Sequence, residues 1–181
     1  MTVIEDGHFR VALMGDAPRA AFRASASLRA EAPADERHGC GPRRVVVEFH
    51  RAVGGLPQQA LIGGVWSPRS GRALQIEVTS SGLWADEERS YLGELGHRLI
   101  PGLPEEYASA VLPVLAQSGL PPGDLSIDRA AHHPVESSPL AFTVAAQLLV
   151  AALAADSDGM VCAVRQRLVD LRRSGRHGAE V

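Results

Sequence analysis

Two adjacent histidines, His132 and His133, are the residues of this 181-residue chain whose type and setting best suit chemistry. An imidazole can stack on a nucleic-acid base, donate a hydrogen bond to a phosphate or bind a metal ion. Pro134 follows the pair, and because proline disfavours helix at the residue before it, the histidines must lie on a turn. Polar side chains on a turn between regular elements are a common location for binding sites.

Three arginines could add positive charge to the same site. Arg129 lies three residues before the histidines, and Arg69 and Arg72 flank a turn that is rich in glycine and proline. Arginines in such positions can neutralise phosphates, and an alternative is that they are ordinary solvated turn residues. All 18 basic residues of the chain are arginine, which is more typical of a GC-rich genome than of a specialised anion site.

Metal ligation has two candidate sets in the sequence, His132 and His133 with Glu136, and His38 with Cys40. Adjacent histidines point apart on most backbones, and neither set has the spacing usual for a zinc site. We therefore expect no metal and no cofactor.

The hydroxyls of Ser137 and Ser138 are better explained by helix capping than by catalysis. They precede Pro139, which suits the first position of a helix, and no GxSxG motif surrounds them. Cys40 and Cys162 form no disulfide pattern and have no local partners for a nucleophile. We expect no enzymatic activity and no catalytic residues.

The composition is that of a globular protein, with 45% hydrophobic and 22% charged residues and a formal net charge of −3. This charge argues against general coating of nucleic acid, although it allows a local basic site. The first residues do not form a signal peptide, and the longest apolar run, 140–155, is shorter than the roughly 20 residues needed to cross a bilayer. We expect a cytoplasmic protein without a membrane segment.

Hydrophobic periodicity and turn residues predict the regular elements. Alternation predicts a hairpin of strands 8–14 and 20–30, and segment 87–100 is ambiguous between helix and other structure. The other expected strands are 43–49, 59–62, 72–79 and 125–128, and the expected helices are 105–118, 139–155 and 160–173.

Two segments, 99–107 (LIPGLPEEY) and 135–142 (VESSPLAF), stand out by their order and spacing. Together they resemble the fourth domain of the translational GTPase elongation factor G and related ribosomal-protection GTPases. Leu99-Ile100-Pro101 followed by Glu105-Glu106-Tyr107 resembles that family's entry to a helix, with two extra residues. The segment 135–142, VESSPLAF, resembles its valine–aspartate–serine–serine–x–x–alanine–phenylalanine motif, with His133 where the family has a loop histidine. The chain lacks a GxxxxGK[ST] motif and therefore cannot be a GTPase.

The resemblance implies an α+β fold, a two-layer sandwich in which a four-stranded sheet is covered by two helices with a left-handed βαβ crossover. It implies an N-terminal extension at 1–42, a core domain at 43–155 and a C-terminal helix and tail at 156–181.

The resemblance also implies a non-enzymatic module that binds RNA, for example at the ribosome. The expected contacts form a tip of five residues: Arg69, Arg72, Arg129, His132 and His133. The alternative is a protein-interaction or scaffold domain that kept the fold and lost RNA binding. The sequence leaves the oligomeric state open.

Overall fold

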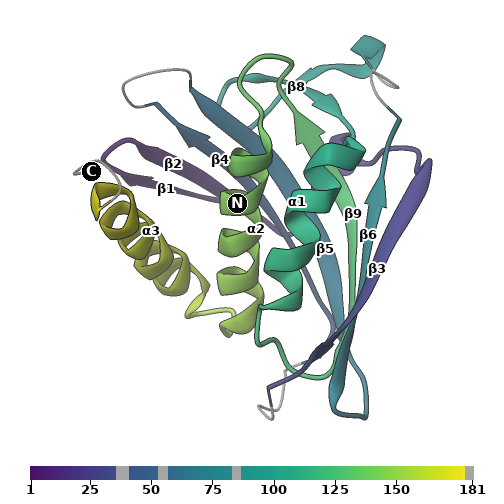
Figure 1. Ribbon diagram of the computed structural model, residues 1–181. Helices are drawn as coiled ribbons and strands as arrows, with labels where there is room; N and C mark the ends of the chain where they lie inside the picture. The colour runs from purple at the N-terminus through teal and green to yellow at the C-terminus, as the bar shows by residue number, and fades with distance from the viewer. Residues whose placement is uncertain (36–40, 53–56, 83–86, 178–181) are drawn as a thin grey trace.

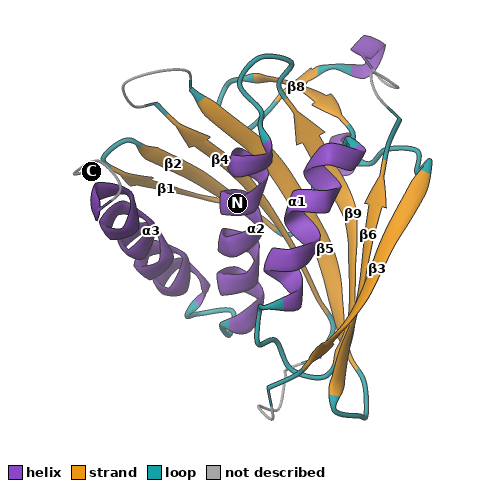
Figure 2. Cartoon of the chain, viewed as in Figure 1, coloured by secondary structure: helices purple, strands orange, loops and turns teal. Residues whose placement is uncertain are grey.

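The computed structural model describes residues 1–35, 41–52, 57–82 and 87–177. The described residues form nine strands in one curled sheet and three α-helices (Figures 1 and 2). The strands are β1 (Thr2–Asp6), β2 (Phe9–Met14), β3 (Ala26–Pro33), β4 (Arg43–Arg51), β5 (Gln58–Pro68), β6 (Ala73–Ser80), β7 (Tyr91–Leu92), β8 (Arg98–Pro101) and β9 (Gly123–His132).

The order of the main strands across the sheet is β1-β2-β4-β5-β9-β6-β3. Neighbours are antiparallel except β6 and β9, which are parallel and joined through helix α1 (Glu105–Ala116). β8 pairs with the end of β9, beyond the point where the pairing with β6 stops, and β7 pairs with β8. The N-terminal segment therefore supplies β1 at one edge of the sheet and β3 at the other.

The centre of the sheet contains a bulge at Gly63 and Gly64, where the register between β5 and β9 shifts. A Cβ atom on Gly64 would lie 2.4 Å from the backbone oxygen of Ser126, so a side chain cannot be accommodated there. A bulge bends the strand and increases its twist, which is consistent with the curl of the sheet.

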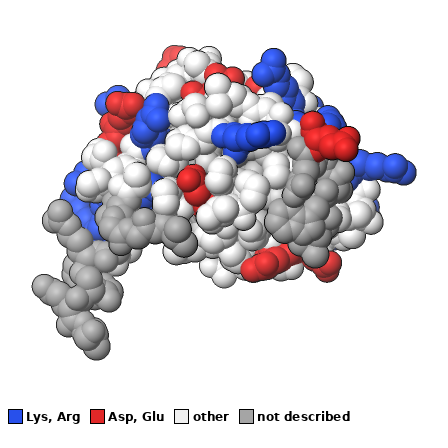
Figure 3. Space-filling view, turned by 90° about the horizontal axis from the view of Figure 1, so that it is seen from above, with Lys and Arg blue, Asp and Glu red and all other residues white. Residues whose placement is uncertain are grey.

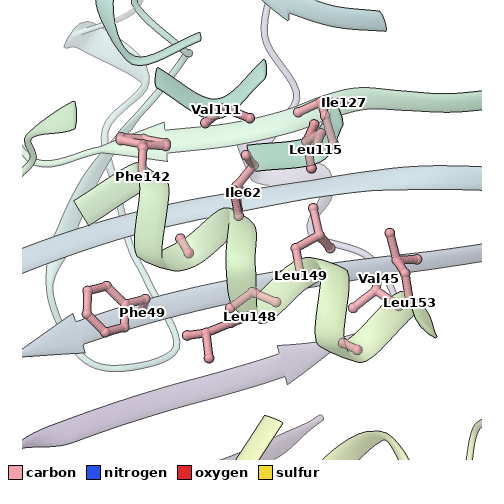
Figure 4. Close-up of a cluster of buried hydrophobic side chains, with 14 of the residues drawn as sticks. Val45, Phe49, Ile62, Val111, Leu115, Ile127, Phe142, Leu148, Leu149 and Leu153 are labelled. Carbon is pink, nitrogen blue, oxygen red and sulfur yellow. The ribbon is translucent and has the colours of Figure 1, made fainter. Parts of the chain in front are cut away.

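Helices α1, α2 (Pro139–Ala154) and α3 (Met160–His177) cover one face of the sheet (Figure 1). α2 packs on β4 and β5, α1 packs on β6 and β3, and α3 packs on α2 and β1. The main core lies between these layers, where Phe142, Leu148 and Leu149 of α2 meet Phe49 and Ile62 of the sheet (Figure 4). None of the helices that the structure describes is long and apolar enough to cross a membrane.

The opposite face of the sheet is covered by short segments rather than by helices. The 3₁₀ turn η1 (Pro18–Ala20) contacts β9 and β8, and the β7–β8 hairpin lies nearby. A small second core forms here from Ala20, Val46, Leu61, Leu99 and Ala131. We call the segment 91–98 the roof, because it lies over the polar residues of β4 described below.

The expected two-layer sandwich with a four-stranded sheet is wrong. The described residues are 41% strand and 30% helix, and a nine-stranded half-barrel dominates the fold. The sequence prediction underestimated the sheet for a physical reason. The strands that the prediction did not include come from segments in which glycine, proline or short length hides the strand pattern.

The predicted hairpin of 8–14 with 20–30 is also wrong. β2 pairs with β1 and β4, whereas β3 lies at the far edge beside β6. The short strand expected at 59–62 is the 11-residue β5, and the ambiguous segment 87–100 contains η2 (Glu87–Arg89), β7 and most of β8. The partners and lengths of these strands depend on pairing with distant segments, and the local alternation of polar and apolar residues carries no information about that pairing.

Candidate metal centre

The structure does not bring the five residues of the expected RNA-binding tip together. Arg69 and Arg72 are exposed in the β5–β6 turn, beside the start of β9, and Arg69 pairs with Asp124 at 3.3 Å. His132 ends β9 and His133 follows it. A strand of this length separates the two groups by about 30 Å.

Arg129 and His132 are engaged within the fold. Arg129 contacts Asp16 and Asp128 at 3.1 Å each, so its charge is offset by two carboxylates. His132 is buried, with its Nδ1 atom 3.4 Å from the backbone oxygen of Gly102 and its ring at the edge of Tyr107.

His133 and the two serines shape the loop before α2. The His133 Nδ1 atom accepts backbone hydrogen bonds from Val135 and Glu136 at 3.3 and 3.2 Å. The Ser137 hydroxyl donates to the Gln59 backbone oxygen at 2.6 Å and accepts from the His133 N–H at 2.9 Å. The Ser138 hydroxyl caps α2 by accepting from the Ala141 N–H at 3.1 Å.

These bonds dock the loop on β5 and hold Glu136 in place. The Gln59 N–H donates to the Glu136 backbone oxygen at 3.0 Å, which fixes the loop from a second direction. The Glu136 side chain is only 21% exposed. Glu136 therefore lies beside the start of β5, a central strand, with its side chain largely shielded from solvent.

Glu136 meets two histidines that the sequence analysis did not select. His50 comes from β4 and His97 from the roof, immediately before β8. One ligand atom from each of the three residues lies within 4.8 Å of the others. Ligand atoms of three side chains from segments far apart in the chain thus lie close together.

The period-two alternation of β4 explains the position of His50. Val45, Val47 and Phe49 point into the main core under the helices. Glu48 and His50 alternate with them and therefore lie on the opposite face, under the roof. His50 is 7% exposed, and Glu48 is fully buried.

The three side chains satisfy one another poorly by hydrogen bonding. His50 Nδ1 and Glu136 Oε2 are buried and make no hydrogen bond to any described residue. The distance from His97 Nδ1 to Glu136 Oε2 is 3.9 Å, longer than a hydrogen bond, and the two imidazole rings stack with centroids 4.1 Å apart. Buried polar atoms without partners are costly, and a group bound at this point would supply the partner that these two atoms lack.

Burial favours the neutral form of His50. Desolvation lowers the pKa of His50 below its ordinary value, and the nearby His97 lowers it further, whereas Glu136 acts in the opposite direction. A neutral imidazole has a free lone pair and is the form that binds a metal ion.

Glu48 holds the roof above β4. Its carboxylate accepts the backbone N–H groups of Glu94 and Leu95 at 2.7 and 3.2 Å. Burial raises the pKa of Glu48, and these two donors partly oppose that effect. Arg10 adds a hydrogen bond to the Leu95 backbone oxygen at 3.1 Å, so the turn that carries His97 is fixed from two strands.

The donor set fits a divalent transition metal. Two imidazoles and one carboxylate are a common three-ligand set for zinc and for iron(II), with metal–ligand bonds of about 2.0–2.2 Å. Such bonds at tetrahedral angles place the ligand atoms about 3.4 Å apart. The distance from His97 Nδ1 to Glu136 Oε2, 3.9 Å, exceeds this by about 0.5 Å. The other ligand atoms lie within 4.8 Å of one another, so small side-chain rotations would bring them to bonding distance of one ion.

The sequence held one usable signal for this centre, in that Glu48 and His50 share a polar face in an otherwise β-branched strand. Nothing local linked that face to His97 or Glu136. Comparison with known proteins does not supply the link, because no family model matches the chain and no curated protein matches it.

Proposed function

We propose that this protein binds a divalent transition-metal ion through His50, His97 and Glu136. The observation that carries the proposal is the convergence of three ligand atoms within 4.8 Å, two of whose residues have buried polar atoms with no hydrogen bond in the described structure. A metal ion would satisfy His50 Nδ1 or Glu136 Oε2, or both.

Partial exposure of two ligands supports a site that an ion can enter. The side chains of His97 and Glu136 are 29% and 21% exposed, whereas His50 forms the buried side of the site. Three protein ligands leave at least one coordination position for water or another small molecule, as in sites that do chemistry rather than sites that only stabilise a fold. Zinc and iron(II) suit nitrogen and carboxylate donors better than calcium or magnesium do.

Titration of Co²⁺ and Zn²⁺ into metal-free protein tests the proposal. Co²⁺ in a site with imidazole ligands gives visible absorption bands, and Zn²⁺ should displace it, because zinc binds such sites more tightly. Glu136→Gln and His97→Ala should each weaken binding by more than the 10–100-fold that is typical for loss of an outer-shell partner.

His8→Ala is the matched control for these variants. His8 is exposed in the β1–β2 turn, so its loss should leave the affinity and the spectrum unchanged. Equal binding by the wild type, Glu136→Gln and His97→Ala would contradict the proposal, as would one-to-one binding that His8→Ala abolishes.

RNA association remains a prediction of the resemblance to elongation factor G, and the geometry supports it less well than metal binding. Arg69 and Arg129 are paired with acidic side chains. Arg69 and Arg72 also lie at the opposite end of β9 from the two histidines. Figure 3 looks onto the end of the molecule where β8 and the loop before α2 lie, and there basic and acidic residues are interspersed among uncharged surface.

A further inference from the structure

A cavity beside the roof is a second place where buried polar groups face unfilled space. Its volume is about 390 Å³, at the lower end of the range for small-molecule sites. It lies between the β2–η1 segment and the roof, and its apolar walls come from Met14, Ala17, Pro18, Leu61 and Leu92. None of the three proposed metal ligands lines it, so its function can be tested separately.

Two polar groups line the interior of this cavity. The Glu48 side chain is fully buried, and its described partners are neutral amide groups rather than a cation. The Tyr91 hydroxyl is buried and makes no hydrogen bond to a described residue. Burial raises the pKa of Tyr91, and the negative charge of Glu48 adds to this effect. Both residues line the same cavity.

The roof packs directly against this carboxylate. The roof lies so close to Glu48 that a Cβ atom on Gly93 would lie 2.5 Å from Glu48 Oε1. A buried carboxylate without a counter-charge is costly, and the cost falls when a cation binds beside it. The rim also carries Glu94 and Asp16, against the single cation Arg19 among the lining residues.

We propose that this cavity binds a small organic amine, with its apolar body between Met14, Leu61 and Leu92 and its ammonium group at Glu48 and Tyr91. The ammonium group donates to the carboxylate and to the phenolic oxygen, so Glu48 gains a counter-charge and the Tyr91 hydroxyl gains a hydrogen-bond partner. Charge-assisted hydrogen bonds of this kind are the stronger ones, and they discriminate an amine from a neutral alcohol of the same shape.

The test compares 2-phenylethylamine with 2-phenylethanol by calorimetry and by ligand-observed NMR. We expect the amine to bind at least about tenfold more tightly than the alcohol, as the difference between charged and neutral hydrogen bonds implies. Glu48→Gln should remove that preference, and Tyr91→Phe should reduce it. Equal binding of amine and alcohol to the wild type, or binding of neither, would overturn the proposal.

Two further variants keep the test decisive if Glu48→Gln does not fold. Ala17→Phe fills the cavity without changing any charge and should weaken amine binding at least about tenfold, because the space for the apolar body is lost. Asp124→Asn removes an exposed acid outside the cavity and should leave binding unchanged. Unchanged binding in Ala17→Phe, or loss of binding in Asp124→Asn, would show that the amine binds elsewhere.

Discussion

Gly93 is the residue that lets the roof approach Glu48. An added Cβ atom would lie within 2.9 Å of three atoms of the buried carboxylate, which has little room to move. We expect Gly93→Ala to destabilise the protein by about 1–3 kcal/mol, the range for overpacking a filled site. Urea unfolding measures the effect.

Gly15→Ala is the control for this substitution. Gly15 is exposed, and nothing lies within 4 Å of the position that its Cβ would occupy. It should change the free energy of unfolding by less than about 0.5 kcal/mol, as is usual for surface positions. Equal effects of the two substitutions would show that the roof does not need its close contact with Glu48.

The adjacent serines before α2 have different roles. Ser138 caps the helix, and we expect Ser138→Ala to lower the free energy of unfolding by about 0.5–2 kcal/mol, because the Ala141 N–H loses its acceptor. Ser109→Ala, at an exposed position inside α1, is the comparison and should have a smaller effect. Thermal or urea unfolding of both variants decides whether the cap contributes as described.

At the scale of elements, α2 is stabilised mainly by its buried face. Leu149 is fully buried against the sheet, whereas Leu140 on the same helix is 55% exposed. We expect Leu149→Ala to cost about 2–5 kcal/mol, since it removes buried methyl groups and leaves a cavity. Leu140→Ala should cost much less, and a reversed order in urea unfolding would show that the helix packs with another face.

The sequence predicted those elements whose own residues carry a clear strand or helix signal. β4 has a β-branched run, and α2 has a serine cap, a proline at its first position and a wide apolar stripe. β5 was largely missed, because Gly63 and Gly64 are poor strand formers that this sheet needs at its bulge. The sequence also could not show that β3 pairs with β6 across 40 or more residues.

The candidate metal centre could not be predicted from the sequence for the same physical reason. His50, His97 and Glu136 are each unremarkable in their own segments, and only the sheet and the roof bring them together. The adjacent pair of His132 and His133 was more conspicuous in the sequence. In the structure these two side chains contact the fold instead, one through Gly102 and the other through its own loop.

At the scale of the whole molecule, the net charge of −3 and the interspersed surface charges in Figure 3 bear on RNA association. If the protein binds ribosomes, co-sedimentation should fall steeply with salt, because phosphate contacts release counterions. His133→Ala should weaken it, since His133 is the partly exposed member of the pair. Absence of co-sedimentation at low salt would contradict the prediction that comes from the resemblance.

Metal binding should also stabilise the whole fold, because it would join three segments that are distant in the sequence. β4, the roof and the loop before α2 would be linked through His50, His97 and Glu136. A ligand that binds only the folded state at 100 times its dissociation constant adds about 2.7 kcal/mol to the free energy of unfolding. Thermal unfolding with and without Zn²⁺ should therefore show a higher midpoint for the wild type and for His8→Ala.

Glu136→Gln separates this linkage from nonspecific stabilisation by the ion. The amide keeps the size of the side chain, and the loop remains docked through backbone bonds to Gln59 and the Ser137 hydroxyl. The variant should therefore fold but gain little from Zn²⁺. Hydrogen exchange should show slower opening of the roof on adding Zn²⁺ to the wild type but not to Glu136→Gln, because the ion would fix His97 to β4. An equal gain in the wild type and Glu136→Gln would place the ion elsewhere, whereas a gain confined to proteins with all three ligands would identify the centre under the roof.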